Sequence, residues 1–164
     1  MDFRLDPDSI AFVQGGRSIT VAAANHALRP SVAKAVGCAV EADGAEVRLF
    51  VVGGKARALF ADLEQSWRVA AVFSQPSTHR TLQIKGHVLA IEHPRPAEVL
   101  LVQQQMDGFA ADLRLIGYAR EFPSTFLGFE RESLRAIRVA IEAAYHQTPG
   151  PGAGRPLPAA AGAP

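Results

Sequence analysis

The sequence has a single cysteine, Cys38, and this scarcity excludes an internal disulfide framework and any multi-cysteine zinc or iron–sulfur site. Charge of one sign is also lacking, since 17 Lys+Arg stand against 16 Asp+Glu. The formal net charge of +1 gives no general basic field, so non-specific nucleic-acid binding is not expected.

Long apolar runs are missing as well. No run approaches the ~18 residues of a membrane span. The first eight residues show no basic region followed by an apolar one, so they do not read as a secretory signal. We therefore expect a cytoplasmic protein without a membrane segment.

The remaining composition is that of a folded domain, with 164 residues, 48% hydrophobic and 20% charged. Short β-branched or alternating runs predict strands, and Asp43-Gly44 is a strong turn signal between two of them. Gly86 lies inside the cleanest alternation and suggests a bulge or a close backbone approach. The predicted strands cover residues 18–24, 32–40, 47–52, 69–73, 82–90 and 134–145, and the first three are expected to form an antiparallel meander.

Helices are predicted between these strands. Asp6 can cap a short helix that has Pro7 at its first position and stops at Gly15. Further helices are expected over residues 56–63, 97–105 and 109–116, the last two as separate segments. Residues 134–145 are also rich in helix formers, but their unbroken alternation favours a strand.

The order of elements indicates an α+β, mainly β, chain: a small closed or nearly closed barrel of six antiparallel strands with flanking helices. We place one domain at residues 1–147. Residues 148–164 are rich in Pro and Gly and cannot form a regular element, so they are either a disordered end or a segment laid along a surface.

A phosphate site is suggested where the third predicted strand meets a helix, in the run Gly53-Gly54-Lys55-Ala56-Arg57. Free amides at a helix N-terminus attract anions, and Lys55 and Arg57 add positive charge. The alternative is a plain turn with two solvated cations.

Two strand faces are further candidates. Residues 31, 33, 35, 37 and 39 of the second strand are all small and are expected on one face. A flat ring could lie against that face. Alternatively, a helix or another subunit packs on it. Thr81, Gln83, Lys85 and His87 make a polar face that offers donors to a heterocycle, or is simply solvated.

Other chemistry has little support. Cys38 lies within a strand among apolar residues, which favours a buried structural thiol. The five histidines are scattered without metal-ligand spacing, so no metal site is expected, and no catalytic acid or base can be named.

The serial order of these features resembles the flavin-binding split-barrel family related to pyridoxamine 5'-phosphate oxidase. The matching stretches are residues 29–32, 49–57, 68–74 and 78–86, and the ending at residues 147–154 is similar to small relatives. The resemblance is good over about half the chain and loose over the C-terminal third.

The resemblance implies a six-stranded barrel, a homodimer, and FMN held in clefts between the subunits. Lys55 and Arg57 would hold the phosphate, while Val51 and Val52 would meet the flavin through backbone groups. Thr81 or Gln83 would complete the site. The second strand would run beside the flavin with Ala33, Lys34, Ala35, Val36 and Cys38.

Departures from the oxidase narrow the expected activity. Ala33 stands where the oxidase has an arginine, with Lys34 next to it. The oxidase's C-terminal substrate-binding segment is missing, so oxidation of pyridoxamine phosphate is not expected.

The sequence thus predicts an FMN-dependent oxidoreductase that transfers hydride between the flavin and a small-molecule substrate. One alternative is a non-catalytic flavin or haem carrier or sensor on the same fold. Another is a structural dimer without a cofactor.

Overall fold

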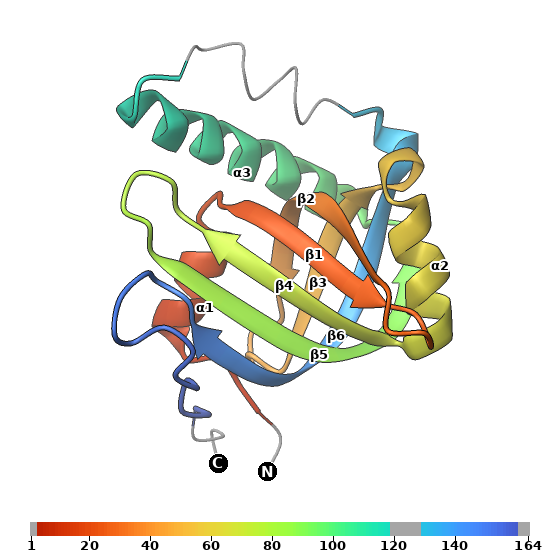
Figure 1. Ribbon diagram of the computed structural model, residues 1–164. Helices are drawn as coiled ribbons and strands as arrows, with labels where there is room; N and C mark the ends of the chain where they lie inside the picture. The colour runs from red at the N-terminus through yellow and green to blue at the C-terminus, as the bar shows by residue number, and fades with distance from the viewer. Residues whose placement is uncertain (1–2, 119–128, 161–164) are drawn as a thin grey trace.

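The computed structural model describes residues 3–118 and 129–160, and within them six strands close into a barrel flanked by three α-helices (Figure 1). The predicted fold class, an α+β chain with a six-stranded antiparallel barrel, is confirmed. The strands are β1 Ser18–Ala24, β2 Pro30–Val40, β3 Glu46–Val52, β4 Arg68–Ser74, β5 Thr81–Glu92 and β6 Leu134–His146. The helices are α1 Pro7–Gln14, α2 Arg57–Ser66 and α3 Pro96–Leu115, with 3-10 turns η1 Gly53–Lys55 and η2 Arg131–Ser133.

The strands follow one another around the barrel in the order β1-β2-β3-β6-β5-β4, and every neighbouring pair is antiparallel. The predicted meander of β1, β2 and β3 is confirmed, and so is the strand at 134–145. Alternate side chains of each strand fill the interior, because successive residues of a strand point to opposite faces of a sheet. Closure pairs each of these six strands with two neighbours, so little sheet edge is left for another chain to pair with.

Helix α1 begins as the sequence predicts. Asp6 accepts a hydrogen bond from Ser9 N–H at 2.8 Å, and Pro7 occupies the first turn, where its missing N–H costs nothing. The helix ends at Gly15 and buries Phe12 and Val13 against the barrel.

The prediction of two separate helices at 97–105 and 109–116 is wrong, since α3 runs unbroken from Pro96 to Leu115. Gly108, between the two predicted segments, lies against Gly15, whose carbonyl oxygen would be 3.5 Å from a Cβ at Gly108. Close packing of a helix can outweigh the cost of a glycine within it, which is about 1 kcal/mol relative to alanine.

The start of α3 is anchored to the barrel by an ion-pair network. Arg48 on β3 is only 2% exposed, and its Nε and Nη2 donate to the two carboxylate oxygens of Glu98 at 2.5 and 3.1 Å. Its Nη1 donates to Glu92, at the end of β5, at 2.5 Å. Glu98 also accepts from Arg95 N–H, so one carboxylate closes the helix N-terminus and fixes it to the barrel.

Residues 148–160 run along the outside of the barrel beside the last part of β6. Tyr145 forms a bridge with Pro156, and Leu157 N–H donates to Ala144 O at 2.8 Å. Leu157 is buried in the barrel core cluster. Of the two expectations for the tail, the segment laid along a surface applies to these residues, while 161–164 lie outside the described part of the chain.

Candidate functional site

A bulge in β2 decides which way the candidate side chains point. The register between β2 and β3 shifts between Ala35 and Gly37, which breaks the alternation of side chains at that point. Ala33, Ala35 and Cys38 belong to the barrel core, whereas Val36 packs in the cluster beneath α3.

The smooth face predicted along residues 31–39 is therefore not one face, and that expectation is wrong. Ala33 and Ala35 point into the barrel, while Gly37 faces α3, where an added Cβ would meet Gln105 Oε1 at 2.6 Å. Of the two alternatives at this strand, a packed helix is what covers Gly37.

The side chains of Ala33, Ala35 and Cys38 are at most 7% exposed. They could reach a ligand only through their main chain. Burial raises the pKa of the Cys38 thiol to about 12, and its Sγ donates to Val13 O at 3.4 Å. Cys38 is thus a protonated structural thiol, as predicted.

The strand–helix passage carries the second group of candidates. Val51 lies in the barrel core, and Val52 packs on the α3 side. Lys55 ends η1 and Arg57 begins α2, and both are exposed. Ala56 gives α2 no side-chain cap, and its first turn holds no acidic residue. The N–H groups and partial positive charge of this helix start are thus available to an anion.

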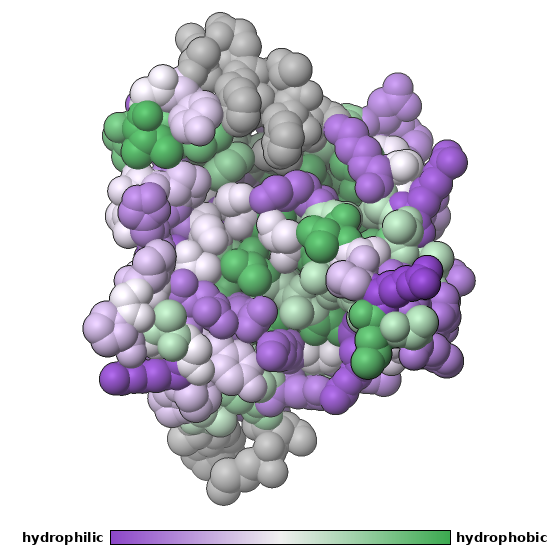
Figure 2. Space-filling model, viewed as in Figure 1, coloured by the Kyte–Doolittle hydropathy of each residue, from purple (hydrophilic) through white to green (hydrophobic). Residues whose placement is uncertain are grey.

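The third group lies on a sheet face that carries no helix. In Figure 1, β1, β4 and β5 face the viewer uncovered, with α3 above them and α2 to one side. We call the outward side chains of these strands, with those of the adjoining parts of β2 and β6, the open face. Figure 2 shows on it a pale and green patch surrounded by purple groups.

Two rows of directly paired residues cross the open face. The first runs from β2 to β6 and contains two of the candidate residues, Lys34 and Gln83. Its members, in order, are Lys34, Thr20, Val72, Gln83 and Tyr145. The second row contains Val32, Ala22, Ala70, Lys85 and Ala143. The closed barrel thus brings Lys34 and Gln83, 49 positions apart in the sequence, onto one surface.

Lys34 is the cation of the first row. Its Nζ donates to Ser18 Oγ at 3.1 Å and to Thr20 Oγ1 at 2.8 Å, both on β1. Partial burial lowers the pKa of Lys34, because water is removed from the charged form. No ion pair joins it to a carboxylate among the described residues. An anion near Lys34 would therefore be favoured.

Thr81 and Gln83 start β5 and are half-buried. Thr81 Oγ1 donates to Ser74 Oγ at 3.1 Å, and Gln83 Oε1 accepts from Gln147 Nε2 at 3.2 Å. The contact with Gln147 uses only the amide oxygen of Gln83, and its amide nitrogen is a donor that a ligand could use. The sequence did not single out Tyr145 or Thr20, although their parity with Ala143 and Ala22 could have placed them on this face.

The donor set fits a phosphate and a polar ring. Lys55 and Arg57 are cations at an uncapped helix start, and Lys34 is a further cation on β2. Ser31 Oγ, near the start of β2, is buried with no hydrogen-bond partner among the described residues, which is typical of a position that a water or ligand group completes. A phosphoryl group needs several such donors at once.

Two findings bound the site further. Within residues 3–118 and 129–160, no cluster of three or more His, Cys, Asp or Glu side chains is arranged to hold a metal ion. In the same residues, no helix combines the length and apolar character needed to cross a membrane.

A closed six-stranded antiparallel barrel with one bare face defines the class of the molecule as a split β-barrel. No protein-family model matches the sequence, and no curated protein matches it. Solved structures do match. An F420 reductase is 18% identical, with a TM-score of 0.55 over 82% of this chain and 93% of the reductase.

Two further structures have the same fold. A candidate pyridoxamine 5'-phosphate oxidase from Lactobacillus delbrueckii is 9% identical, with a TM-score of 0.54 over 87% of this chain and 93% of its own. An FMN-binding protein from Syntrophomonas wolfei is 9% identical, with a TM-score of 0.53 over 82% of this chain and 80% of its own. This chain therefore has the split-barrel fold of the pyridoxamine 5'-phosphate oxidase-like, FMN-binding proteins, as its sequence resemblance implied.

Proposed function

We propose that this protein is an FMN-dependent oxidoreductase that binds the flavin where two copies of the chain meet. The observation that carries the proposal is the open face: within residues 3–118 and 129–160, no carboxylate pairs with its Lys34 and no helix lies over it. Similar folds in an F420 reductase and an FMN-binding protein support the choice of cofactor. When bound, FMN supplies two-electron redox chemistry.

The chain's own residues would bind and orient the cofactor. Lys55, Arg57 and the uncapped start of α2 would hold the phosphate, and Lys34 would add a third cation. Gln83 would donate to polar atoms of the ring from β5, and the Thr81 hydroxyl oxygen, whose hydrogen is already used within the protein, could accept. Val36, Val51 and Val52, like the buried residues of β2, would contribute through packing and main-chain groups.

A second copy would exclude water from the ring. The open face exposes Val32, at 62% of its surface, at the β2 end of the second row. Apolar groups on a bare sheet face favour association, since burial stabilises by roughly 25 cal/mol per Å². A homodimer that encloses the cofactor follows from this proposal.

The test begins with the purified full chain. We expect a yellow protein, or colourless protein that binds added FMN one per chain with quenching of flavin fluorescence. The double variant Lys55→Met/Arg57→Met should weaken FMN binding about 10- to 100-fold, from roughly 1.5–3 kcal/mol per charge-assisted bond reduced by solvent exposure. Arg114→Met, an exposed cation at the far end of α3, is the matched control and should bind FMN normally.

The alternatives give different results. If FMN binds but no nicotinamide cofactor reduces it under anaerobic conditions, the protein is a flavin carrier or sensor. A Soret band on purification would indicate haem, and preferential binding of F420 would indicate a deazaflavin. Failure to bind any of these would overturn the proposal and leave the structural dimer.

A further inference from the structure

A shallow cavity lies in the open face, apart from the cations of the strand–helix passage. It has a volume of about 470 Å³, which is in the range of small-molecule sites, roughly 300–1,000 Å³. Its floor is the second row of the open face, where Ala22, Ala70 and Ala143 line the cavity beside Lys85. We call this row the alanine trough.

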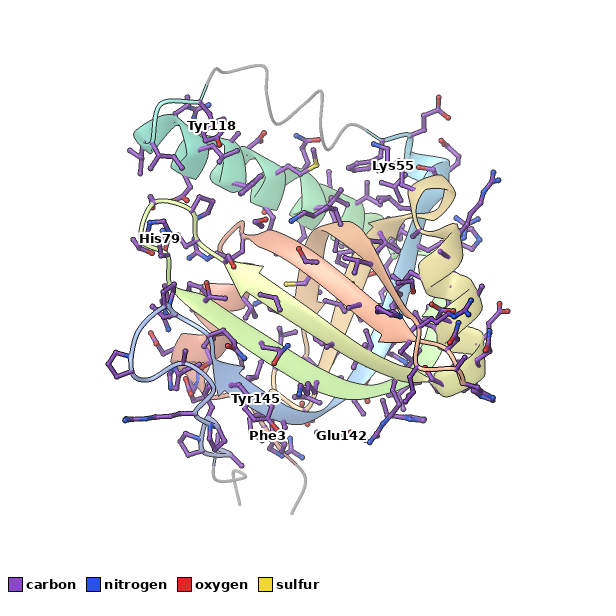
Figure 3. All side chains as sticks on the ribbon, viewed as in Figure 1. Phe3, Lys55, His79, Tyr118, Glu142 and Tyr145 are labelled. Atoms are coloured by element: carbon purple, nitrogen blue, oxygen red, sulfur yellow. The ribbon has the colours of Figure 1, made fainter. Side chains whose placement is uncertain are left out.

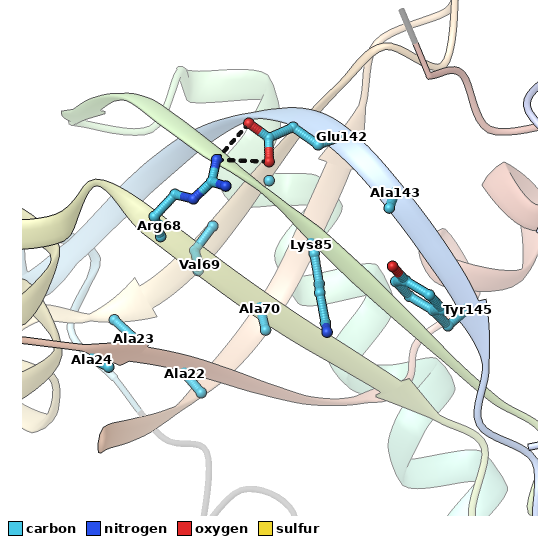
Figure 4. A pocket seen from close by; sticks show the side chains of 11 residues that line it. Ala22, Ala23, Ala24, Arg68, Val69, Ala70, Lys85, Glu142, Ala143 and Tyr145 are labelled. Carbon is cyan, nitrogen blue, oxygen red and sulfur yellow. Dashed lines mark hydrogen bonds and ion pairs between the residues drawn. The ribbon is translucent and has the colours of Figure 1, made fainter. Parts of the chain in front are cut away.

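The trough exists because a row of small side chains runs between rows of larger ones. On one side lies the row that includes Val72 and Tyr145. On the other side Arg68 Nη1 donates to both oxygens of Glu142, at 2.7 and 2.8 Å, and this pair bridges over β5 (Figure 4). The floor crosses three strand spacings of about 4.8 Å, so it is long and flat.

The bulge at Gly86 also shapes the trough. The register between β5 and β6 shifts between Lys85 and Gly86, and a Cβ at Gly86 would lie 2.1 Å from Ala140 O. The two strands thus approach more closely than a side chain at position 86 would allow, and the extra residue of the register shift, Glu142, lies on β6.

The charged groups of the trough favour a negatively charged ligand. Arg68 is neutralised by Glu142. Lys85 forms no ion pair with a carboxylate among the described residues, and its Nζ lies 5.0 Å from the centre of the Tyr145 ring. Figure 4 shows Lys85 extended between Ala70 and Tyr145. One cation beside an aromatic wall, over a flat apolar floor, is complementary to a planar molecule with a single negative charge.

We propose that the alanine trough binds a planar aromatic carboxylate, with its ring on the alanine floor and its carboxylate on Lys85. A carboxylate fits better than a phosphate, because the trough offers one ammonium and no free guanidinium fork. Lys85 lies two residues along β5 from Gln83, about 7 Å. The trough therefore adjoins the flavin position, and its role as the place of the organic substrate rests on the proposed function; the binding itself does not.

In the experiment the full chain is titrated with 2-naphthoate as the probe, and binding is measured by calorimetry. We expect saturable binding of one probe per chain, and binding of the neutral 2-naphthamide at least about tenfold weaker. Lys85→Met should abolish the preference for the acid, and Lys85→Arg should retain it. Lys55→Met is the matched control: it should weaken FMN binding and leave naphthoate binding unchanged.

A second variant distinguishes ligand binding in the trough from effects on folding and on dimer formation. Ala70→Phe fills the trough floor, so it should remove naphthoate binding while the molecular mass in solution stays the same. Loss of the dimer in Ala70→Phe would mean that a second copy occupies the trough, and would overturn the proposal. No binding of naphthoate, or binding that Lys85→Met leaves unchanged, would overturn it too.

The two proposals can fail independently. Protein that binds naphthoate through Lys85 but takes up no flavin would refute the proposed function and keep the trough. Protein that binds FMN but not naphthoate would refute the trough proposal and support the proposed function.

Discussion

The side-chain amide of Gln105 hydrogen-bonds both main-chain groups of Cys38: Oε1 accepts from Cys38 N–H at 2.8 Å, and Nε2 donates to Cys38 O at 2.8 Å. Cys38 lies beyond Ala35, the last residue of β2 that pairs with β1. Gln105 therefore takes the place of a neighbouring strand where β1 and β2 separate. Further along, Val40 N–H donates to Gln14 of α1 at 2.9 Å.

Replacing Gln105 should be costly. Gln105→Met keeps the side-chain length but leaves a buried N–H and a buried C=O without partners, so we expect the free energy of unfolding to fall by about 2–4 kcal/mol. Urea denaturation measures it. Gln104→Met, exposed on the same helix, should change stability by less than about 0.5 kcal/mol. Equal losses of stability in Gln105→Met and Gln104→Met would contradict the role of Gln105 as a hydrogen-bonding replacement for a neighbouring strand.

Removing Arg48 should also be costly. Arg48→Met leaves the buried Glu98 without its guanidinium, and breaking such a buried pair costs about 3–5 kcal/mol. The double variant Arg48→Met/Glu98→Met should recover part of this loss, because no buried charge is left unpaired and Glu92, which also loses Arg48, is 43% exposed to water. Chemical denaturation of the three proteins gives the comparison, and a double variant less stable than Arg48→Met would refute this account.

Gly86 should tolerate no side chain. In Gly86→Ala the new Cβ would meet the main chain of β6, which cannot move without shifting the barrel, so a loss of about 1–3 kcal/mol or more is expected. Gly54→Ala is the control, since, its chain neighbours aside, no atom of the part of the chain that the structure describes lies within 4 Å of its Cβ position. Thermal unfolding of both variants is the measurement. A Gly86→Ala protein as stable as Gly54→Ala would show that the strands are not this close.

The α1 cap should make stability depend on pH. The hydrogen bond from Ser9 N–H lowers the pKa of Asp6 below its ordinary value of 3.8. Because the folded-state pKa is the lower one, the charged cap stabilises the protein fully above pH 4–5, about one unit above the unfolded value, and this contribution is lost as pH falls through the folded-state pKa.

Asp6→Ala should therefore be about 1 kcal/mol less stable than the wild type at pH 7, and the difference should shrink at pH 2–3. Urea denaturation at several pH values measures it. Asp6→Asn can still cap and should lose less. A deficit in Asp6→Ala that is independent of pH would contradict a role for the carboxylate.

Much of the fold could be predicted because its signals are local. The Asp6-Pro7 pair marks the start of α1, alternation in the sequence marks β6, and Gly86 marks the close approach of β5 to β6 beside a register shift. The basic helix start at Lys55 and Arg57 could be predicted in the same way, because both cations follow Gly53-Gly54 within a few positions of the sequence. Figure 3 shows Lys55 and Tyr145 at opposite sides of the open face, a relation that no local signal contains.

The sequence by itself determined the strands, most helix limits and the residue types available to an anion, because periods of two and 3.6 residues and helix caps act within a few positions. Tertiary structure alone decided which way β2 points its candidates. A one-residue bulge reverses the side-chain parity beyond it, and the bulge depends on β3 and α3 rather than on β2 itself. Tertiary packing likewise kept α3 whole across Gly108 and brought Lys34, Gln83 and Tyr145 into one row, because closure of the barrel joins strands that are distant in the chain.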